Sequence, residues 1–135
     1  MKTKLFRSSN EGRFWLFVSF IGSNNNNDTT TLGRNGSNYT ASLIANYLDA
    51  EELQNYTHVD GIYTANPELV PDAKKIDLLS FNEANEIANF GATILHAKTI
   101  IPLLEKNIPL RVLNTFNHEN QGTLITSKSN KEGIK

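Results

Sequence analysis

The amino-acid sequence predicts an α/β fold with a mainly parallel sheet. Short runs of β-branched and aromatic residues alternate along the chain with longer segments of helical periodicity, and turn-forming residues separate the two. The 135 residues, 39% hydrophobic and 20% charged, suit one ordinary globular domain. Sheets of this class bind ligands beyond the carboxyl ends of their strands, so we expect a functional site at that edge.

The chain is expected to begin with a polar tail, a strand and a loop. Residues 1–13 show no hydrophobic period, which is typical of a tail. Residues 14–21 (FWLFVSFI) are aromatic and β-branched, which predicts a buried strand. Residues 22–31 are Gly, Ser, Asn, Asp and Thr, and these favour turns over regular structure, so we expect a loop.

A helix is expected over residues 36–49 and a second strand over residues 53–59. Ser37 or Asn38 could cap the helix by accepting a free backbone N–H. Apolar side chains at helical spacing form a stripe that we expect to face the core. The stripe comprises Tyr39, Leu43, Ile44, Tyr47 and Leu48.

The second half of the chain predicts two more helices. Ser80 and Glu83 match the reciprocal capping pattern, so a helix should begin at residue 80 and end or bend at Gly91. Another helix is expected over residues 99–106. Its inward side chains would be Ile100, Leu103 and Leu104.

Two strands and a tail complete the expected elements. Residues 110–113 (LRVL) and 123–126 (TLIT) predict strands, and residues 128–135 predict a frayed polar tail. Strands that alternate with helices are what favours parallel over antiparallel pairing.

Charge and composition argue against several kinds of function. The formal net charge is −1, which gives no basic excess to hold a nucleic acid backbone. No apolar run approaches the roughly 20 residues of a membrane-spanning helix. Without cysteine the chain can have neither disulfides nor thiolate metal ligands. The spacing of His58, His96 and His118 fits no zinc motif.

Residues 29–38 (TTTLGRNGSN) are the strongest candidate for a binding site. Gly33 and Gly36 allow the backbone to approach a ligand closely, and free N–H groups at a helix start attract anions. Arg34 could hold a carboxylate or a phosphate with two parallel hydrogen bonds. The alternative is a glycine-rich loop that only caps the helix, since the spacing matches neither a Walker loop nor a dinucleotide-binding fingerprint.

Six motifs in order resemble those of the aspartokinases, and TTLGRNGS in particular resembles the signature TTLGR-x-GS. The motifs are FIGSN (20–24), TTLGRNGS (30–37), VDGIYTANP (59–67), FGATILH (90–96), IPLRV (108–112) and GTLI (122–125). By this resemblance the chain is similar, from about residue 20 to residue 127, to aspartate kinases of the amino-acid kinase family. Within the family the chain most resembles the bifunctional aspartokinase/homoserine dehydrogenase type.

The resemblance implies a three-layer αβα amino-acid kinase fold of the carbamate kinase type. Residues 14–127 would form its nucleotide-binding C-terminal half. The family transfers the γ-phosphoryl group of ATP, carried with Mg²⁺, to the β-carboxylate of L-aspartate in lysine, threonine and methionine biosynthesis. A cytoplasmic enzyme is implied that binds small molecules, not nucleic acid or membranes. It would be a homo-oligomer or would pair with a missing N-terminal half.

The same resemblance implies two groups of site residues. Arg34, Asn35, Gly36 and Ser37 would bind aspartate, and Asn38 would occupy the position of the family's catalytic aspartate. The nucleotide would lie against the second group, which consists of Thr57, His58, Tyr63, Glu68, Thr93 and Ile94.

Four of these positions depart from the family pattern, and each changes a charge. Asn38 and His58 replace aspartates, Glu68 replaces an arginine and Thr93 replaces a lysine. Losing two cations beside a triphosphate costs about 1 kcal/mol or more each. The family's KFGGTS segment, aspartate-binding glutamate and regulatory ACT domains have no counterpart here. We therefore expect little or no activity from the chain alone, and the alternatives are a non-catalytic nucleotide-binding module or a structural remnant.

Overall fold

The computed structural model describes residues 19–33, 35–89 and 97–127. A four-stranded sheet consists, in spatial order, of β3 (Leu53–Thr57), β7 (Leu110–Asn114), β8 (Thr123–Thr126) and β6 (Leu78–Ser80). The pairs β3–β7 and β6–β8 are parallel, and the central pair β7–β8 is antiparallel. The predicted α/β fold with a mainly parallel sheet is therefore confirmed.

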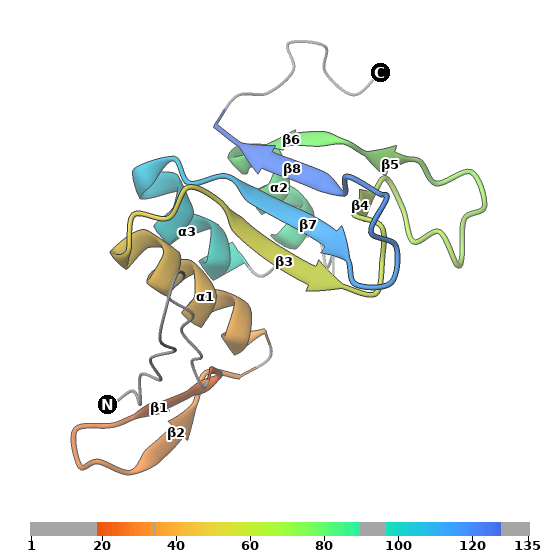
Figure 1. Cartoon of the computed structure of the whole chain (residues 1–135). Helices are drawn as coiled ribbons and strands as arrows, with labels where there is room; N and C mark the ends of the chain where they lie inside the picture. The colour runs from red at the N-terminus through yellow and green to blue at the C-terminus, as the bar shows by residue number, and fades with distance from the viewer. Residues whose placement is uncertain (1–18, 34, 90–96, 128–135) are drawn as a thin grey trace, which may run out of the picture.

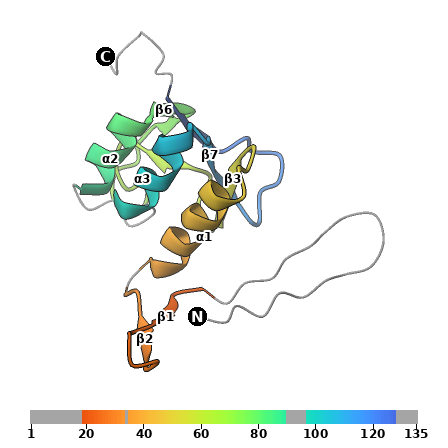
Figure 2. The same ribbon diagram turned by 90° about the vertical axis from the view of Figure 1, so that its left-hand side faces the viewer.

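Three helices cover one face of this sheet (Figures 1 and 2). They are α1 (Gly36–Tyr47), α2 (Phe81–Asn89) and α3 (Ala97–Lys106). α1 packs against β3 and α3, whereas α2 packs against β6, β8 and α3. The described residues thus supply the sheet and one helical layer of the predicted three-layer architecture.

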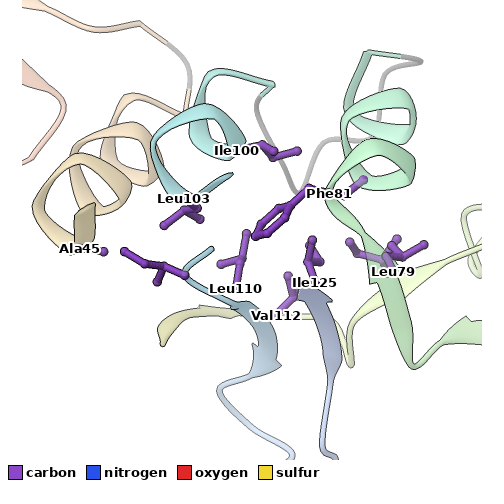
Figure 3. Packing of buried hydrophobic residues seen from close by; sticks show 11 residues of the cluster. Ala45, Leu79, Phe81, Ile100, Leu103, Leu110, Val112 and Ile125 are labelled. Carbon is purple, nitrogen blue, oxygen red and sulfur yellow. The ribbon is translucent and has the colours of Figure 1, made fainter. Parts of the chain in front are cut away.

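The core lies between the sheet and these helices (Figure 3). Phe81, the first residue of α2, lies among Ile100 of α3, Leu110 of β7 and Ile125 of β8. Alternate side chains of β7 and β8 point into this layer, as expected for strands with one covered face. The full cluster consists of Ala45, Ile62, Leu79, Phe81, Ala84, Ile100, Leu103, Ile108, Leu110, Val112 and Ile125.

The start of α2 follows the sequence prediction. The backbone N–H of Ser80 donates to Glu83 Oε2 at 2.7 Å, and the N–H of Glu83 donates to Ser80 Oγ at 3.2 Å. Ser80 Oγ also donates to Glu83 Oε2 at 2.6 Å. The reciprocal cap is confirmed, and its hydrogen bonds hold the pKa of the Glu83 carboxyl below its usual value.

The later elements are largely as predicted. The helix expected over 99–106 and both C-terminal strands are present. Ile100 and Leu103 are buried, but Leu104 is 45% exposed, so its predicted inward position is wrong. β6 and the hairpin of β4 (Ile62–Tyr63) with β5 (Lys75–Ile76) are unexpected, because strands of two or three residues carry too little alternation to recognise.

The apolar stripe predicted for α1 does not face the core. Tyr47 is 85% exposed, and Leu43 and Leu48 are also exposed. The face that packs against the sheet and α3 instead carries small side chains, among them Ser42 and Ala45, which are buried. Small residues let the helix approach its neighbours closely at full packing density, so helical period alone did not reveal the buried face.

Residues 22–31 form most of a hairpin instead of the expected loop. β1 (Ile21–Ser23) pairs with β2 (Thr29–Thr31) in antiparallel register. Asn24 organises the turn, because its Oδ1 accepts the backbone N–H groups of Asn26 and Asp28, both at 2.9 Å. The asparagine run therefore closes a hairpin, and the prediction of an irregular loop is wrong at its two ends.

Several terminal predictions fall on residues outside the described part of the chain. These are the tails over 1–13 and 128–135 and most of the strand expected over 14–21. At the described end of that strand Phe20 is 52% exposed, so burial is wrong there. Within the described residues no helix is both long enough and apolar enough to cross a membrane.

Candidate functional site

The loop before α1 turns sharply through residues with positive φ. Gly33 has φ 77° and Asn35 has φ 60°, a conformation that glycine and asparagine tolerate best. The N–H of Gly36 donates to the Gly33 carbonyl at 3.1 Å. A Cβ on Gly36 would lie 2.6 Å from Leu32 Cβ, so a larger residue would displace the loop. These glycines are needed for the turn itself, whether or not a ligand binds.

The first turn of α1 has the character of an anion site. Asn35 holds the N-cap position without a side-chain hydrogen bond, and the first turn has no acidic residue. The prediction that Ser37 or Asn38 caps the helix is therefore wrong. Ser37 is exposed and Asn38 is half-buried beside it. Because no carboxylate offsets the positive end of the helix dipole here, this end favours an anionic ligand.

A groove of about 480 Å³ follows α1 from this first turn to the start of β3. Ser37 and Asn38 line it near the helix start, and Ile44, Leu48 and Leu53 give it an apolar lining farther along. Its polar groups are therefore concentrated toward the helix start.

Glu52, at the far end of the groove, is held by an ion pair. Arg111 Nη2 lies 3.1 Å from Glu52 Oε2, and Arg111 Nε donates to both carboxylate oxygens at 3.2 Å. The hydrogen bonds from Arg111 hold the pKa of Glu52 below its usual value. This pair joins the residue before β3 to β7, so it stabilises the sheet edge and leaves no free charge for a ligand at that end.

The carboxyl ends of β3 and β7 form a second candidate region. The carbonyl of Thr57, the last residue of β3, accepts the N–H of Thr115 at 2.8 Å. Asp60 ties the two following loops together, because its carboxylate accepts Asn114 Nδ2 at 2.7 Å and Asn117 Nδ2 at 3.1 Å. Sequence reasoning missed this cluster. Asp60 lies just beyond the end of β3, and Asn114 is the last residue of β7. Polar residues at strand ends were therefore the signal in the sequence that could have predicted the cluster.

Four of the predicted nucleotide-site residues lie in the described part of the chain. Exposed His58 follows Thr57 at the strand end, with its Nδ1 3.4 Å from Thr57 Oγ1. Tyr63 is half-buried on β4. Glu68 is exposed in the connection between β4 and β5, where its N–H donates to Asn66 Oδ1 at 3.0 Å.

The two groups of predicted residues lie toward the same end of the sheet. α1 runs antiparallel to β3, so its first turn points toward the end of β3 that carries Thr57 (Figure 1). Among the described residues no three His, Cys, Asp or Glu side chains gather as a metal site. The predicted site residues outside the described part are Arg34, Thr93 and Ile94.

Comparison with protein families gives a match to the amino acid kinase family over residues 3–114. The match begins at residue 3, within the N-terminal segment before residue 20 in which no family motif was recognised. Two relatives are similar over most of the chain. The lysine-sensitive aspartokinase 3 of Escherichia coli is 46% identical over 120 residues, and a bifunctional aspartokinase/homoserine dehydrogenase of Haemophilus influenzae is 41% identical over 119 residues.

A solved structure of Escherichia coli aspartokinase III, in complex with aspartate and ADP, resembles this chain with a TM-score of 0.80 and 45% identity. The similarity covers 84% of this chain but only 25% of that one. Coverage of the two relatives is 26% and 15% of their lengths. The chain therefore spans about a quarter or less of the length of these three proteins.

Proposed function

We propose, from the premise that this chain belongs to the amino acid kinase family, that it is part of an aspartate kinase. The observation that supports this most is the likeness, at 45% identity and a TM-score of 0.80, to an enzyme that holds aspartate and ADP. On this proposal residues 14–127 are the nucleotide-binding half of a catalytic domain. The protein would work in the cytoplasm, in lysine, threonine and methionine biosynthesis.

Aspartate would bind at the start of α1. Its carboxylates suit a helix end with no acidic side chain, and Arg34 would add a bidentate grip. Ser37 and Asn38, which line the groove there, would orient the substrate. A β-carboxylate oxygen would then attack the γ-phosphorus of ATP as the bond to ADP breaks, a reaction that depends mainly on positioning and charge neutralisation.

ATP would lie beyond the ends of β3 and β7. Thr57, His58 and Tyr63 offer hydroxyl and ring groups that suit the neutral parts of a nucleotide. Mg²⁺ would be held chiefly by the phosphates, its usual mode in such sites, and would neutralise their charge. Glu68 is a poor neighbour for phosphates, so cations from Arg34 or from outside the chain would have to compensate.

The proposal predicts a defined pattern of activity in a chimera. The matched segment of Escherichia coli lysine-sensitive aspartokinase 3 would be replaced by this chain, and ADP release would be followed in a coupled assay. We expect aspartate-dependent turnover that is weaker than that of the parent. Asn38→Asp, Glu68→Arg and Thr93→Lys, which restore the family's charges, should together raise it by about tenfold or more.

Matched variants make this experiment decisive. Arg34→Ala should abolish aspartate-dependent turnover, whereas Tyr47→Ala, at an exposed position at the end of α1, should leave it unchanged. A folded chimera without aspartate-dependent ADP release, even with all three reversions, would refute the proposed function. The isolated chain should release ADP at a negligible rate.

A second candidate is a nucleotide-binding module without catalysis, favoured by the missing charges at residues 38 and 68. Calorimetry of the isolated chain with ATP and Mg²⁺ separates it from an inert remnant. Heat that saturates, without turnover in the fully reverted chimera, would favour the module. No heat at millimolar ligand would exclude it.

We also propose that the chain pairs with the rest of a kinase domain. Within the described residues β3 pairs only with β7, which leaves its other edge open, and the groove beside α1 is largely apolar. A separately produced N-terminal segment of the Escherichia coli relative should bind the chain in size-exclusion chromatography. If the chain is monomeric, does not bind this segment and unfolds in one sharp transition, the result would argue against the pairing.

A further inference from the structure

The hydroxyl of Thr123 joins the β4–β5 hairpin to the main sheet. Thr123 is the first residue of β8 and is fully buried. Its Oγ1 accepts the N–H of Ile62 at 2.8 Å and donates to the carbonyl of Ile76 at 2.5 Å. Ile62 and Ile76 face each other across the hairpin. A single hydroxyl of β8 therefore links one strand of the hairpin to the other and both strands to β8.

Two glycines make room for this contact. A Cβ on Gly61, whose φ is 136°, would lie 2.5 Å from Thr123 Oγ1. A Cβ on Gly122, whose φ is 68°, would lie 1.9 Å from the carbonyl oxygen of Val112. Both positions therefore require glycine, and the backbone on either side of the hydroxyl is fixed by steric fit.

Lys75 adds a second attachment on the other strand of the hairpin. Its Nζ donates to Asn120 Oδ1 at 3.0 Å and to the Gly122 carbonyl at 3.3 Å, and it lies 2.9 Å from Asp77 Oδ1. The N–H of Gly122 also donates to Asn120 Oδ1 at 2.9 Å. The loop before β8 is thus bound to β5 by side chains as well as by the Thr123 hydroxyl.

The hairpin held in this way carries Tyr63, which directly follows Ile62. A change in the position of the Ile62 backbone must move Tyr63, because the two share a peptide unit. The Thr123 side chain itself is enclosed and cannot touch a ligand in the site. Its influence on that site can only pass through the backbone that it holds.

We propose that Thr123 is a positioning residue for nucleotide binding, which sets the place of Tyr63 through the backbone of Ile62. This inference rests on the proposed nucleotide site. A structural role in stability alone would predict that loss of the hydroxyl destabilises the chain without changing the affinity of the folded protein for nucleotide. A positioning role predicts that affinity also falls.

Two measurements on the full chain test the inference. Thr123→Val removes both hydrogen bonds at nearly constant shape, and Thr123→Ser retains them. Hydrogen exchange at the Ile62 and Tyr63 amides should become about tenfold faster in the valine variant and stay near wild type in the serine variant. Calorimetric titration with ADP and Mg²⁺ should show affinity about tenfold weaker for valine and within about twofold for serine.

Thr99→Val is the matched control, since Thr99 is a buried threonine of α3 whose hydroxyl has no hydrogen-bond partner among the described residues. It should change neither measurement. Should Thr123→Val fail to fold, Thr123→Cys keeps a weaker hydrogen-bonding group in the same place and should show smaller effects in the same direction.

The outcomes distinguish failure of the positioning role of Thr123 from failure of the proposed nucleotide site. If the wild type binds nucleotide and the folded valine or cysteine variant binds it with the same affinity, the positioning role is overturned. Unchanged exchange at Ile62 overturns the attachment itself, with or without nucleotide. A wild-type sequence that binds no nucleotide, either alone or within the chimera, overturns the proposed nucleotide site, and with it the role assigned to Thr123.

Discussion

Removing the cap of α2 should cost a measurable and pH-dependent part of the stability. Ser80→Ala deletes the oxygen that accepts the Glu83 N–H at 3.2 Å and donates to Glu83 Oε2 at 2.6 Å. Loss of such an N-cap typically costs about 1 kcal/mol. For a chain of 135 residues that corresponds to a fall in Tm of roughly 3–4 °C.

The pH dependence follows from the lowered pKa of Glu83. A carboxyl with a folded-state pKa below its unfolded value stabilises the fold above the unfolded pKa, about 4.3 for glutamate. That stabilisation is lost as the pH falls through the folded-state pKa. Because Ser80 is the main cause of the lowered pKa, the difference between wild type and Ser80→Ala should narrow from pH 7 to pH 3. Part of the stability difference should remain at pH 3, because the hydrogen bond from the Glu83 N–H to Ser80 Oγ does not depend on the charge of the carboxyl.

Urea denaturation followed by circular dichroism measures this difference at each pH. Ser37→Ala is the matched control, because Ser37 was the expected cap of α1 but makes no capping hydrogen bond. It should cost less than about 0.5 kcal/mol. The reasoning fails if Ser80→Ala costs no more than Ser37→Ala, or if its cost is constant down to pH 3.

Four further substitutions test the packing by the same urea method. Leu103→Ala, in the core, should cost about 2–5 kcal/mol, whereas Leu104→Ala, 45% exposed, should cost less than about 1 kcal/mol. A reversed order would contradict the buried face assigned to α3. Thr99→Val should leave stability unchanged or raise it slightly, because the buried hydroxyl lacks a partner among the described residues. A loss above about 1 kcal/mol would point to a bound water instead. Gly122→Ala should cost about 3 kcal/mol or more, since its Cβ would collide with the Val112 carbonyl. Near-native stability would show that this turn can relax.

The sequence predicted best those features that depend on neighbouring residues. The Ser80–Glu83 cap spans a single helical turn, and its residue types determine its hydrogen bonds. The strand over 123–126 was recognised because three of its four residues, TLIT, are β-branched. β4, with two residues, is too short to be recognised in this way.

Features that depend on distant parts of the chain were predicted less well. Tyr47 and Leu43 have the spacing of an inner face, but the face of α1 that packs against α3 and β3 carries small buried residues. The contact of Asp60 with Asn114 joins two strand ends that are far apart in sequence. The family was recognised from motifs, because several short segments in a fixed order are specific without any tertiary information; the individual roles of Arg34, Asn38 and the other site residues stay predictions.

The order of the strands has a consequence for how the protein is made. β7 and β8 are the central strands of the sheet, yet each follows both of its outer strands, β3 and β6, along the chain. β3 can pair only after β7 has been synthesised, because Leu53 pairs with Leu110. In the same way β6 can pair only after β8 has been synthesised. Until the ribosome has made β7 and β8, β3 and β6 therefore have no native neighbour in this sheet, and the sheet can close only after both central strands have been synthesised. Such late, long-range closure is slow, and this leaves the earlier strands exposed to chaperones or to pairing with other chains.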